Sequence, residues 1–352
     1  MSEIVVRPYQ QGDETGIISL FNEVFPQNIT LEHWRWKYQE NSAGFPLISV
    51  AVDGTKIVAH RSYIPANFVL EGKVVKATHS VDFMVHPHYR KRGITGQMSK
   101  LTGQQLRTAS ISFNYTFPMP HVEALVKHLT GFKTAFPVPS WAKLRNPAYF
   151  LKRPLLRYPS IQSRFRTLGL AMLKGRPQQP SFQQTTLSKK LNLKHVDEYD
   201  ESADILWNTV ADRHRVSRIR DTRYLNWRYD PKRYSKLAFY NGPKLNGFVV
   251  VAVDMWHGWV IGHIVDVLAI DSHSVRVLLD GALDNLRDQG VDLIRCWISP
   301  DAIVEPELVR LGFRSRPPPG NVLVGVYDHN IDGDILLNPE NWYLTQGDAD
   351  GV

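Results

Sequence analysis

The sequence predicts an α+β protein that holds two copies of one fold. Three observations lead to this prediction. A strand runs through a basic, glycine-punctuated turn into a helix at residues 81–101. Period-two strands alternate with helical patterns over the first 140 residues, and three short motifs of that region recur later in the same order. Each copy is therefore expected to be a mixed sheet flanked by helices.

Length and composition agree with two domains of ordinary size. The chain has 352 residues, 43% of them apolar, which is enough for real cores. No run of eighteen apolar residues and no signal-peptide pattern occurs, so we expect a cytoplasmic protein without a membrane span. The single cysteine, Cys296, excludes an intramolecular disulfide and a multi-cysteine metal cluster, and no metal is expected. Its setting, DLIRCWIS, indicates core packing.

The first elements follow from periodicity. A strand at the N-terminus precedes a helix for which Asp13 is a plausible N-cap. Residues 47–54 and 56–72 read as a hairpin that turns at Asp53-Gly54. A third strand, 73–86, leads into the basic turn. The apolar stripe of the helix consists of Ile17, Ile18, Leu20, Phe21, Val24 and Phe25.

The stretch after this third strand has the features of a phosphate-binding turn. Pro87 cannot donate to a sheet ladder and should end the strand. Two glycines, Gly93 and Gly96, allow the backbone to approach a ligand, and the first turn of the following helix offers free N–H groups. An anion of pyrophosphate type would be held there, with Arg90 and Arg92 neutralising its charge.

These residues resemble a known family. Val85 and Pro87, followed by Arg90-x-x-Gly93-Ile94-x-Gly96, look like the coenzyme A signature of the GNAT superfamily of N-acetyltransferases. The alternative is an ordinary basic strand-helix turn. The resemblance implies acetyl-CoA as co-substrate, with its thioester against the end of the fourth strand, where backbone N–H groups of residues 84–86 would stabilise the oxyanion. The implied cofactor-binding residues are Met84, Val85, Arg90, Lys91, Arg92, Gly93, Ile94, Thr95 and Gly96.

The resemblance extends over roughly residues 3–140. A helix at 95–109 is followed by a strand, ISFNYTFP, which matches the fifth strand of the family and would splay from the fourth to admit the pantetheine arm. A helix, HVEALVKHL, and then Thr130-Gly131-Phe132 match the family's approach to its last hairpin.

The resemblance also suggests catalytic residues. Asp82 stands where many family members carry a carboxylate base, although it can equally be a structural carboxylate. His79 and His121 are alternative bases because an unperturbed imidazole titrates near neutral pH. The family's usual acid, a tyrosine, is replaced by Lys127, so Tyr115 or solvent would have to supply the proton.

The second half repeats the first. Residues 36–38, 81–84 and 130–133 recur as 227–229, 265–268 and 311–314, at separations of 191, 184 and 181. Asp266 thereby repeats Asp82, which strengthens the structural interpretation of that carboxylate. The second copy has Asp271 and no glycine in its turn, so pyrophosphate would meet a negative charge there. We therefore expect two tandem GNAT-like domains, of which only the first binds the cofactor.

The predicted domain limits follow. They are 1–140 for the N-terminal GNAT domain, 141–196 for a basic linker, 197–330 for the degenerate copy and 331–352 for a tail. The linker shows one apolar helical face, which predicts either a helix that contacts a membrane surface through 155–176 or a packed connecting helix. RNA binding ranks below both. In the tail, Trp342 and Tyr343 should cover an apolar surface, whereas the acidic end should be disordered.

The preferred function is transfer of an acetyl group from acetyl-CoA to a primary amine in a ternary complex. The tail resembles those of GNAT proteins of polysaccharide synthesis, so an amino sugar or sugar nucleotide is the preferred acceptor. Tryptophans such as Trp36 and Trp227 can stack on sugar rings, or simply fill cores. Two alternatives remain: an aminoacyl-tRNA-dependent transferase, against which the phosphate-type turn argues, and a non-catalytic tandem scaffold.

Overall fold

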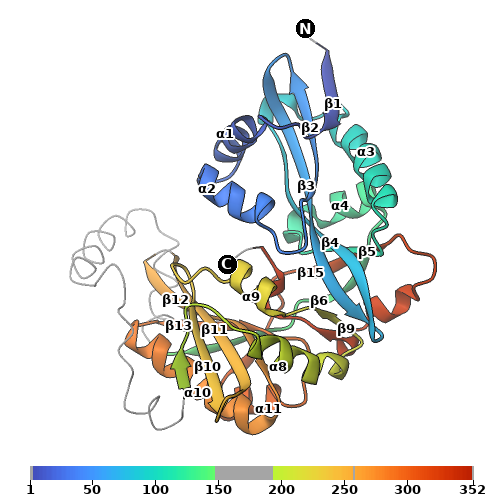
Figure 1. Ribbon diagram of the computed structural model, residues 1–352. Coiled ribbons are helices and arrows are strands. Elements are labelled where there is room, and N and C mark those ends of the chain that lie inside the picture. The colour runs from blue at the N-terminus through green and yellow to red at the C-terminus, as the bar shows by residue number, and fades with distance from the viewer. Residues whose placement is uncertain (1–2, 147–192, 257, 351–352) are drawn as a thin grey trace. The chain divides into compact units, whose positions relative to one another are not determined.

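The computed structural model describes residues 3–146, 193–256 and 258–350, which divide into two compact units (Figure 1). The first unit comprises Met1–Val138, Ala211–Trp227 and Pro318–Trp342, and the second comprises Pro139–Val210, Arg228–Pro317 and Tyr343–Val352. Each unit is built around one mixed sheet that carries helices. The predicted α+β class is confirmed.

The sheet of the first unit has the order β1-β2-β3-β4-β5-β15-β6, with β9 added to β3 and β16 to β9. The β4–β5 pair in the middle of this sheet is parallel. The strands are β1 (Ile4–Pro8), β2 (Leu47–Asp53), β3 (Lys56–Leu70), β4 (Lys73–Val85), β5 (Phe113–Thr116), β6 (Lys133–Pro137), β9 (Val216–Arg218), β15 (Asn321–Val326) and β16 (Trp342–Tyr343). The helices are α1 (Glu14–Val24), α2 (Leu31–Trp34), α3 (Ile94–Thr108), α4 (Glu123–Thr130) and most of α9 (Thr222–Arg228).

The sheet of the second unit has the order β14-β7-β13-β12-β11-β10-β8, and here the β12–β13 pair is parallel. The strands are β7 (Ser140–Leu144), β8 (Leu193–His195), β10 (Ser235–Asn241), β11 (Lys244–Trp256), β12 (Trp259–Ala269), β13 (Leu293–Trp297) and β14 (Arg314–Arg316). The helices are α8 (Ser202–Val210), α10 (Ser272–Asp288) and α11 (Glu305–Arg310). Cys296 on β13 is 1% exposed, in agreement with a core role.

The units differ from the contiguous segments expected from the sequence, because the last strands of the two copies are exchanged. The family's final hairpin would pair β6 with β7, but β6 pairs with β15 and β7 pairs with β13 and β14. Pro137 and Pro139 flank the step from β6 to β7. Proline cannot donate to a ladder, so this junction disfavours a tight hairpin and lets the chain pass into the second sheet.

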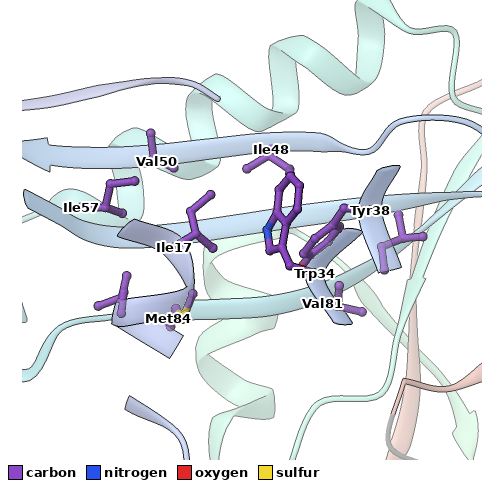
Figure 2. Close-up of a cluster of buried hydrophobic side chains, with 10 residues drawn as sticks. Ile17, Trp34, Tyr38, Ile48, Val50, Ile57, Val81 and Met84 are labelled. Carbon is purple, nitrogen blue, oxygen red and sulfur yellow. The ribbon is translucent and has the colours of Figure 1, made fainter. Parts of the chain in front are cut away.

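The core of the first unit lies between its sheet and α1–α2 (Figure 2). Ile17 of α1 and Trp34 of α2 pack against Ile48, Val81 and Met84 of the strands. On α3, Ile94 and Met98 pack against a second cluster that includes Val58 and Ala59. The predicted hairpin is confirmed, since β2 and β3 pair from Leu47↔Tyr63 to Asp53↔Lys56. Burial of these side chains holds β4 rigidly in the middle of the sheet.

The segments outside the two copies depart from their predicted roles. The predicted amphipathic helix lies outside the described residues, but both ends of the predicted linker, β7 and β8, are strands of the second unit. Trp342 is buried among aromatic rings as expected. The acidic end is ordered up to residue 350, contrary to expectation, because Asp348 is buried and closes a capping box with Thr345. None of the described helices is long and apolar enough to cross a membrane.

Candidate active site

The turn between β4 and α3 has the backbone that an anion site requires. β4 ends at Val85, just before Pro87, and α3 begins at Ile94, so both predicted limits hold within one residue. Gly93 is the N-cap of α3 with φ of 76°, a left-handed conformation that favours glycine. The N–H groups of the first turn of α3 have no acceptor within the helix. A Cβ added to Gly96 would meet open space, so this position leaves room for a ligand.

The basic side chains of the turn are exposed. Arg90, Lys91 and Arg92 all lie on the surface. Arg90 is tethered, because its Nε donates to the carbonyl oxygen of Val85 at 3.2 Å. The guanidinium of Arg92 lies over the ring of Tyr89 at 4.9 Å. These contacts keep two positive charges beside the N-terminus of α3, where they can neutralise phosphate oxygens.

The strands β4 and β5 separate next to this turn. They pair only over Ala77–His79 and Phe113–Tyr115, and the Thr116 hydroxyl then donates to the Ser80 carbonyl oxygen at 3.0 Å. β4 continues to Val85 without a described partner on that side. The divergence matches the predicted splay, and the free strand edge can accept an extended arm of a ligand.

The direction of the N–H groups along this edge selects one oxyanion donor. The N–H of His86 donates to Val58 of β3 at 2.9 Å, so it is not available to a ligand. Successive N–H groups of a strand point to opposite sides, which directs the N–H of Val85 away from β3. Within residues 84–86, where the sequence suggested donors, Val85 is therefore the one that the geometry favours.

A β-bulge interrupts β4 at Asp82. Ser62 pairs with Val81 and His60 with Met84, so two residues, Asp82 and Phe83, face one residue of β3. Asp82 has φ of 49°, a sparsely populated conformation that persists only where neighbours hold it. The buried His60 ring holds it from β3, because His60 Nδ1 lies 2.8 Å from the Asp82 carbonyl oxygen and donates to it.

The Asp82 carboxylate is engaged in an ion pair. Lys37 Nζ lies 2.7 Å from it, and the Tyr38 hydroxyl donates to the same oxygen. Burial alone would raise the pKa of Asp82, but the Lys37 charge and the hydrogen bonds from Lys37 and Tyr38 outweigh burial and hold the pKa below its ordinary value. A carboxylate in this state is a weak base, so the geometry favours the structural interpretation of Asp82.

The second unit has a related arrangement. Asp266 is 1% exposed and accepts a hydrogen bond from the Tyr229 hydroxyl at 2.8 Å, as Asp82 does from Tyr38. Arg228, which corresponds to Lys37, instead donates to the carbonyl oxygens of Gly347 and Ala349. The tyrosine–aspartate bond is thus a feature of both copies.

The helix α10 of the second unit is capped by its own acid. The Asp271 side chain accepts the N–H of Ser274 at 2.7 Å, which places a carboxylate at the helix N-terminus. An anionic ligand would be repelled there.

The other two predicted catalytic residues occupy different settings. Tyr115 on β5 is fully buried, stacks on His79 at 4.8 Å and accepts a hydrogen bond from Arg218 Nη1 at 3.3 Å. It lies at the last paired position before β4 and β5 separate. His121 lies on the surface in a 3-10 turn, Pro120–Val122, that precedes α4. Of the two, only Tyr115 belongs to the strands that bound the opening.

Sequence reasoning missed Lys37, His60 and Arg218. Lys37 and Tyr38 sit in a π-helical turn, Arg35–Gln39, which contains the repeated motif 36–38. The available signal was that both copies carry a cation in this motif, Lys37 or Arg228, and an aspartate in the corresponding strand, Asp82 or Asp266. His60 and Arg218 carried none, because their partners come from β4 and β5, far away in the sequence.

Trp36 and Trp227 are hydrogen-bonded to each other. The indole N–H of Trp36 donates to the Trp227 carbonyl oxygen at 2.7 Å, and that of Trp227 donates to the Trp36 carbonyl oxygen at 2.8 Å. Their rings stack at 5.8 Å. This reciprocal contact within the first unit favours the packing interpretation over a sugar platform.

Comparisons with known proteins agree with this geometry. Residues 5–124 match the model of the acetyltransferase (GNAT) domain family. These residues are a GNAT acetyltransferase domain. The protein is accordingly an acyltransferase enzyme of the GNAT type, for which an acyl-CoA is the typical co-substrate. No curated protein matches the chain in sequence.

Several solved structures share the fold of this chain. A GCN5-related N-acetyltransferase from Anabaena variabilis is 12% identical with a TM-score of 0.63, over 93% of this chain and 73% of that one. One from Kribbella flavida is 11% identical with a TM-score of 0.59, over 92% and 71%. Saccharomyces cerevisiae N-myristoyltransferase with bound myristoyl-CoA is 12% identical with a TM-score of 0.60, over 93% and 80%. The likeness supports two tandem GNAT-like domains across the chain.

Proposed function

We propose that the first unit binds acetyl-CoA at the turn from Arg90 to Gly96 and transfers the acetyl group to a primary amine. The observation that carries this is the junction of β4 and α3, where a left-handed Gly93, exposed arginines and the free edge of β4 occur together. The pyrophosphate would lie at the N-terminus of α3 and the pantetheine arm along β4. The capped α10 argues for one cofactor site per chain.

Residues of the first unit have distinct proposed roles in acetyl transfer. Bound acetyl-CoA supplies a thioester that the neutral amine attacks directly, with release of the coenzyme A thiol. The N–H of Val85 would donate to the carbonyl oxygen as it becomes anionic. Lys37, Tyr38 and His60 would act by holding the bulge that orients this strand end.

Proton transfer is assigned to residues near the strand opening. Tyr115 is our candidate acid, because it lies where β4 and β5 part and Arg218 fixes its hydroxyl. Asp82 remains the sequence-based candidate for the base, but its ion pair with Lys37 makes solvent or His79 better suited to receive the amine proton. His121 lies outside these strands and is the weakest of the predicted candidates.

The preferred acceptor remains an amino sugar or sugar nucleotide. Calorimetry with acetyl-CoA tests the cofactor half of the proposal, and we expect one molecule bound per chain. A panel of amino sugars, polyamines and peptides, assayed for thiol release, tests the acceptor half. Absence of acetyl-CoA binding would refute acetyl transfer, and turnover of peptides alone would refute the sugar acceptor.

A further inference from the structure

Tyr89 ties the candidate cofactor turn to the β2–β3 hairpin. It is the last residue of a 3-10 turn, Pro87–Tyr89, between β4 and α3. Its hydroxyl donates to the carboxylate of Asp53, the last residue of β2, at 2.7 Å. Its ring packs against the apolar cluster that contains Val58 of β3 and Ile94 of α3. A hydrogen bond and apolar packing thus anchor the ring before any ligand arrives.

The anchored ring carries the guanidinium of Arg92. The guanidinium lies 4.9 Å from the centre of the ring, a distance at which a cation is attracted to an aromatic face. In the part of the chain that the structure describes, Arg92 forms no ion pair, and its side chain is exposed. Its charge is therefore available to a ligand, while the ring limits the conformations that the side chain must give up on binding.

The backbone between the two arginines of the turn adopts a rare conformation. Lys91 has φ of 63°, in the left-handed region, which residues other than glycine enter mainly where their neighbours hold them. On one side of it, Arg90 is tethered to a carbonyl oxygen of β4. On the other side, Arg92 lies over Tyr89 and directly precedes Gly93, the N-cap of α3. The ring thereby holds a positive charge beside the helix end at which the phosphates are proposed to bind.

We propose that Tyr89 is a positioning residue for the cofactor: anchored on Asp53, its ring presents the Arg92 guanidinium to a phosphate of acetyl-CoA. The phosphate is either part of the pyrophosphate or the 3′-phosphate, since a guanidinium binds both through the same hydrogen bonds. The inference rests on the proposed function, which supplies the cofactor and the turn. Tyr89 touches no reacting atom in this arrangement. Its loss should therefore raise Kd and KM for acetyl-CoA and leave kcat unchanged.

A double-mutant cycle tests whether Tyr89 acts through Arg92. The Kd of acetyl-CoA is measured by calorimetry for Tyr89→Leu, Arg92→Gln and the double variant. Tyr89→Leu should raise Kd about threefold to tenfold, the effect of one cation–aromatic contact and of the order that it imposes. In the Arg92→Gln background, the same substitution should change Kd by less than about twofold. An unchanged Kd in Tyr89→Leu, or an equal factor in both backgrounds, would overturn the inference.

Two further variants separate the anchor from general effects on the protein. Tyr240→Leu is the matched control, because Tyr240 of β10 in the second unit carries Lys194 at 4.8 Å from its ring centre. It should bind acetyl-CoA as the wild type does, and weakening equal to that of Tyr89→Leu would overturn the inference. Tyr89→Phe keeps the ring and removes the bond to Asp53, so Kd should rise about twofold to threefold. A wild-type Kd in Tyr89→Phe would contradict the Asp53 anchor, and a lower kcat in Tyr89→Leu would contradict a positioning role.

Acetyl-dephospho-CoA, which lacks the 3′-phosphate, identifies the phosphate that Arg92 meets. The factor lost in Tyr89→Leu should persist with this compound if Arg92 binds the pyrophosphate, and should disappear if Arg92 binds the 3′-phosphate. Either result supports the inference, whereas a factor absent from both compounds would overturn it.

Binding of coenzyme A itself separates this inference from the proposed function. Coenzyme A binding that depends on Tyr89 through Arg92, together with no thiol release from acetyl-CoA with any amine, would support the positioning role and refute acetyl transfer. Thiol release together with a Kd that Tyr89→Leu leaves unchanged would do the reverse.

Discussion

Replacement of Gly96 by glutamate tests the anion site directly. Gly96 is the third residue of α3, has no left-handed φ, and has open space where a Cβ would lie. The substitution therefore introduces a carboxylate at the helix N-terminus without backbone strain. We expect Gly96→Glu to fold normally and to lose most of its affinity for acetyl-CoA.

The magnitude follows from charge repulsion. Two unit charges about 5 Å apart repel each other by about 3 kcal/mol at an effective dielectric constant of about 20. That energy corresponds to a dissociation constant on the order of 100-fold higher. The free energy of unfolding should rise instead, by about 1 kcal/mol, because glycine is a poor helix former and an acid in the first turn interacts favourably with the helix dipole.

Gly103→Glu is the matched control. Gly103 lies on the same helix, and a Cβ there would meet only the flexible end of Arg107. This variant adds the same charge and the same helix propensity farther from the turn. Calorimetry with acetyl-CoA and urea unfolding are measured for both variants. Gly96→Glu that binds within threefold of wild type, or Gly103→Glu that binds equally weakly, would refute the site at the α3 N-terminus.

Three further predictions concern two residues that hold the bulge, Lys37 and His60, and the candidate acid Tyr115. Lys37→Met should lower the free energy of unfolding by about 3 kcal/mol or more, because it leaves the Asp82 carboxylate buried without its cation. Urea unfolding measures this loss, and adding Asp82→Asn should restore part of it. A loss below about 1 kcal/mol would contradict the ion pair. His60 has a pKa lowered mainly by burial, so the unfolded state binds the extra proton first and stability should fall as pH falls below about 6.5. His60→Asn should reduce this slope between about pH 5 and 7, and an unchanged slope would contradict a neutral buried ring. If the Tyr115 phenol is the acid, Tyr115→Phe should leave acetyl-CoA affinity unchanged and slow turnover on the order of tenfold to 100-fold. Turnover equal to that of the wild-type enzyme would remove Tyr115 from the mechanism.

The sequence predicted the elements that local chemistry determines. The period of β4, the proline that follows it and the glycines before α3 act over a few residues, so the strand, the turn and the helix could all be placed within one or two positions. The repeats at 36–38 and 227–229 indicated two copies of one fold, because repetition is visible without any three-dimensional information.

The contacts that bear on chemistry were decided by the tertiary structure. Lys37 reaches Asp82 across 45 residues, His60 reaches the bulge from β3, and Arg218 reaches Tyr115 across 103 residues. The exchange of β7 and β15 between sheets likewise depends on pairing partners far along the chain. A sequence pattern reports the conformation of a segment, whereas the charge state and the partner of a side chain depend on what the fold packs against it. The sequence by itself thus determined the glycine-containing turn before α3 and the duplication, and the tertiary structure decided that Asp82 is ion-paired with Lys37.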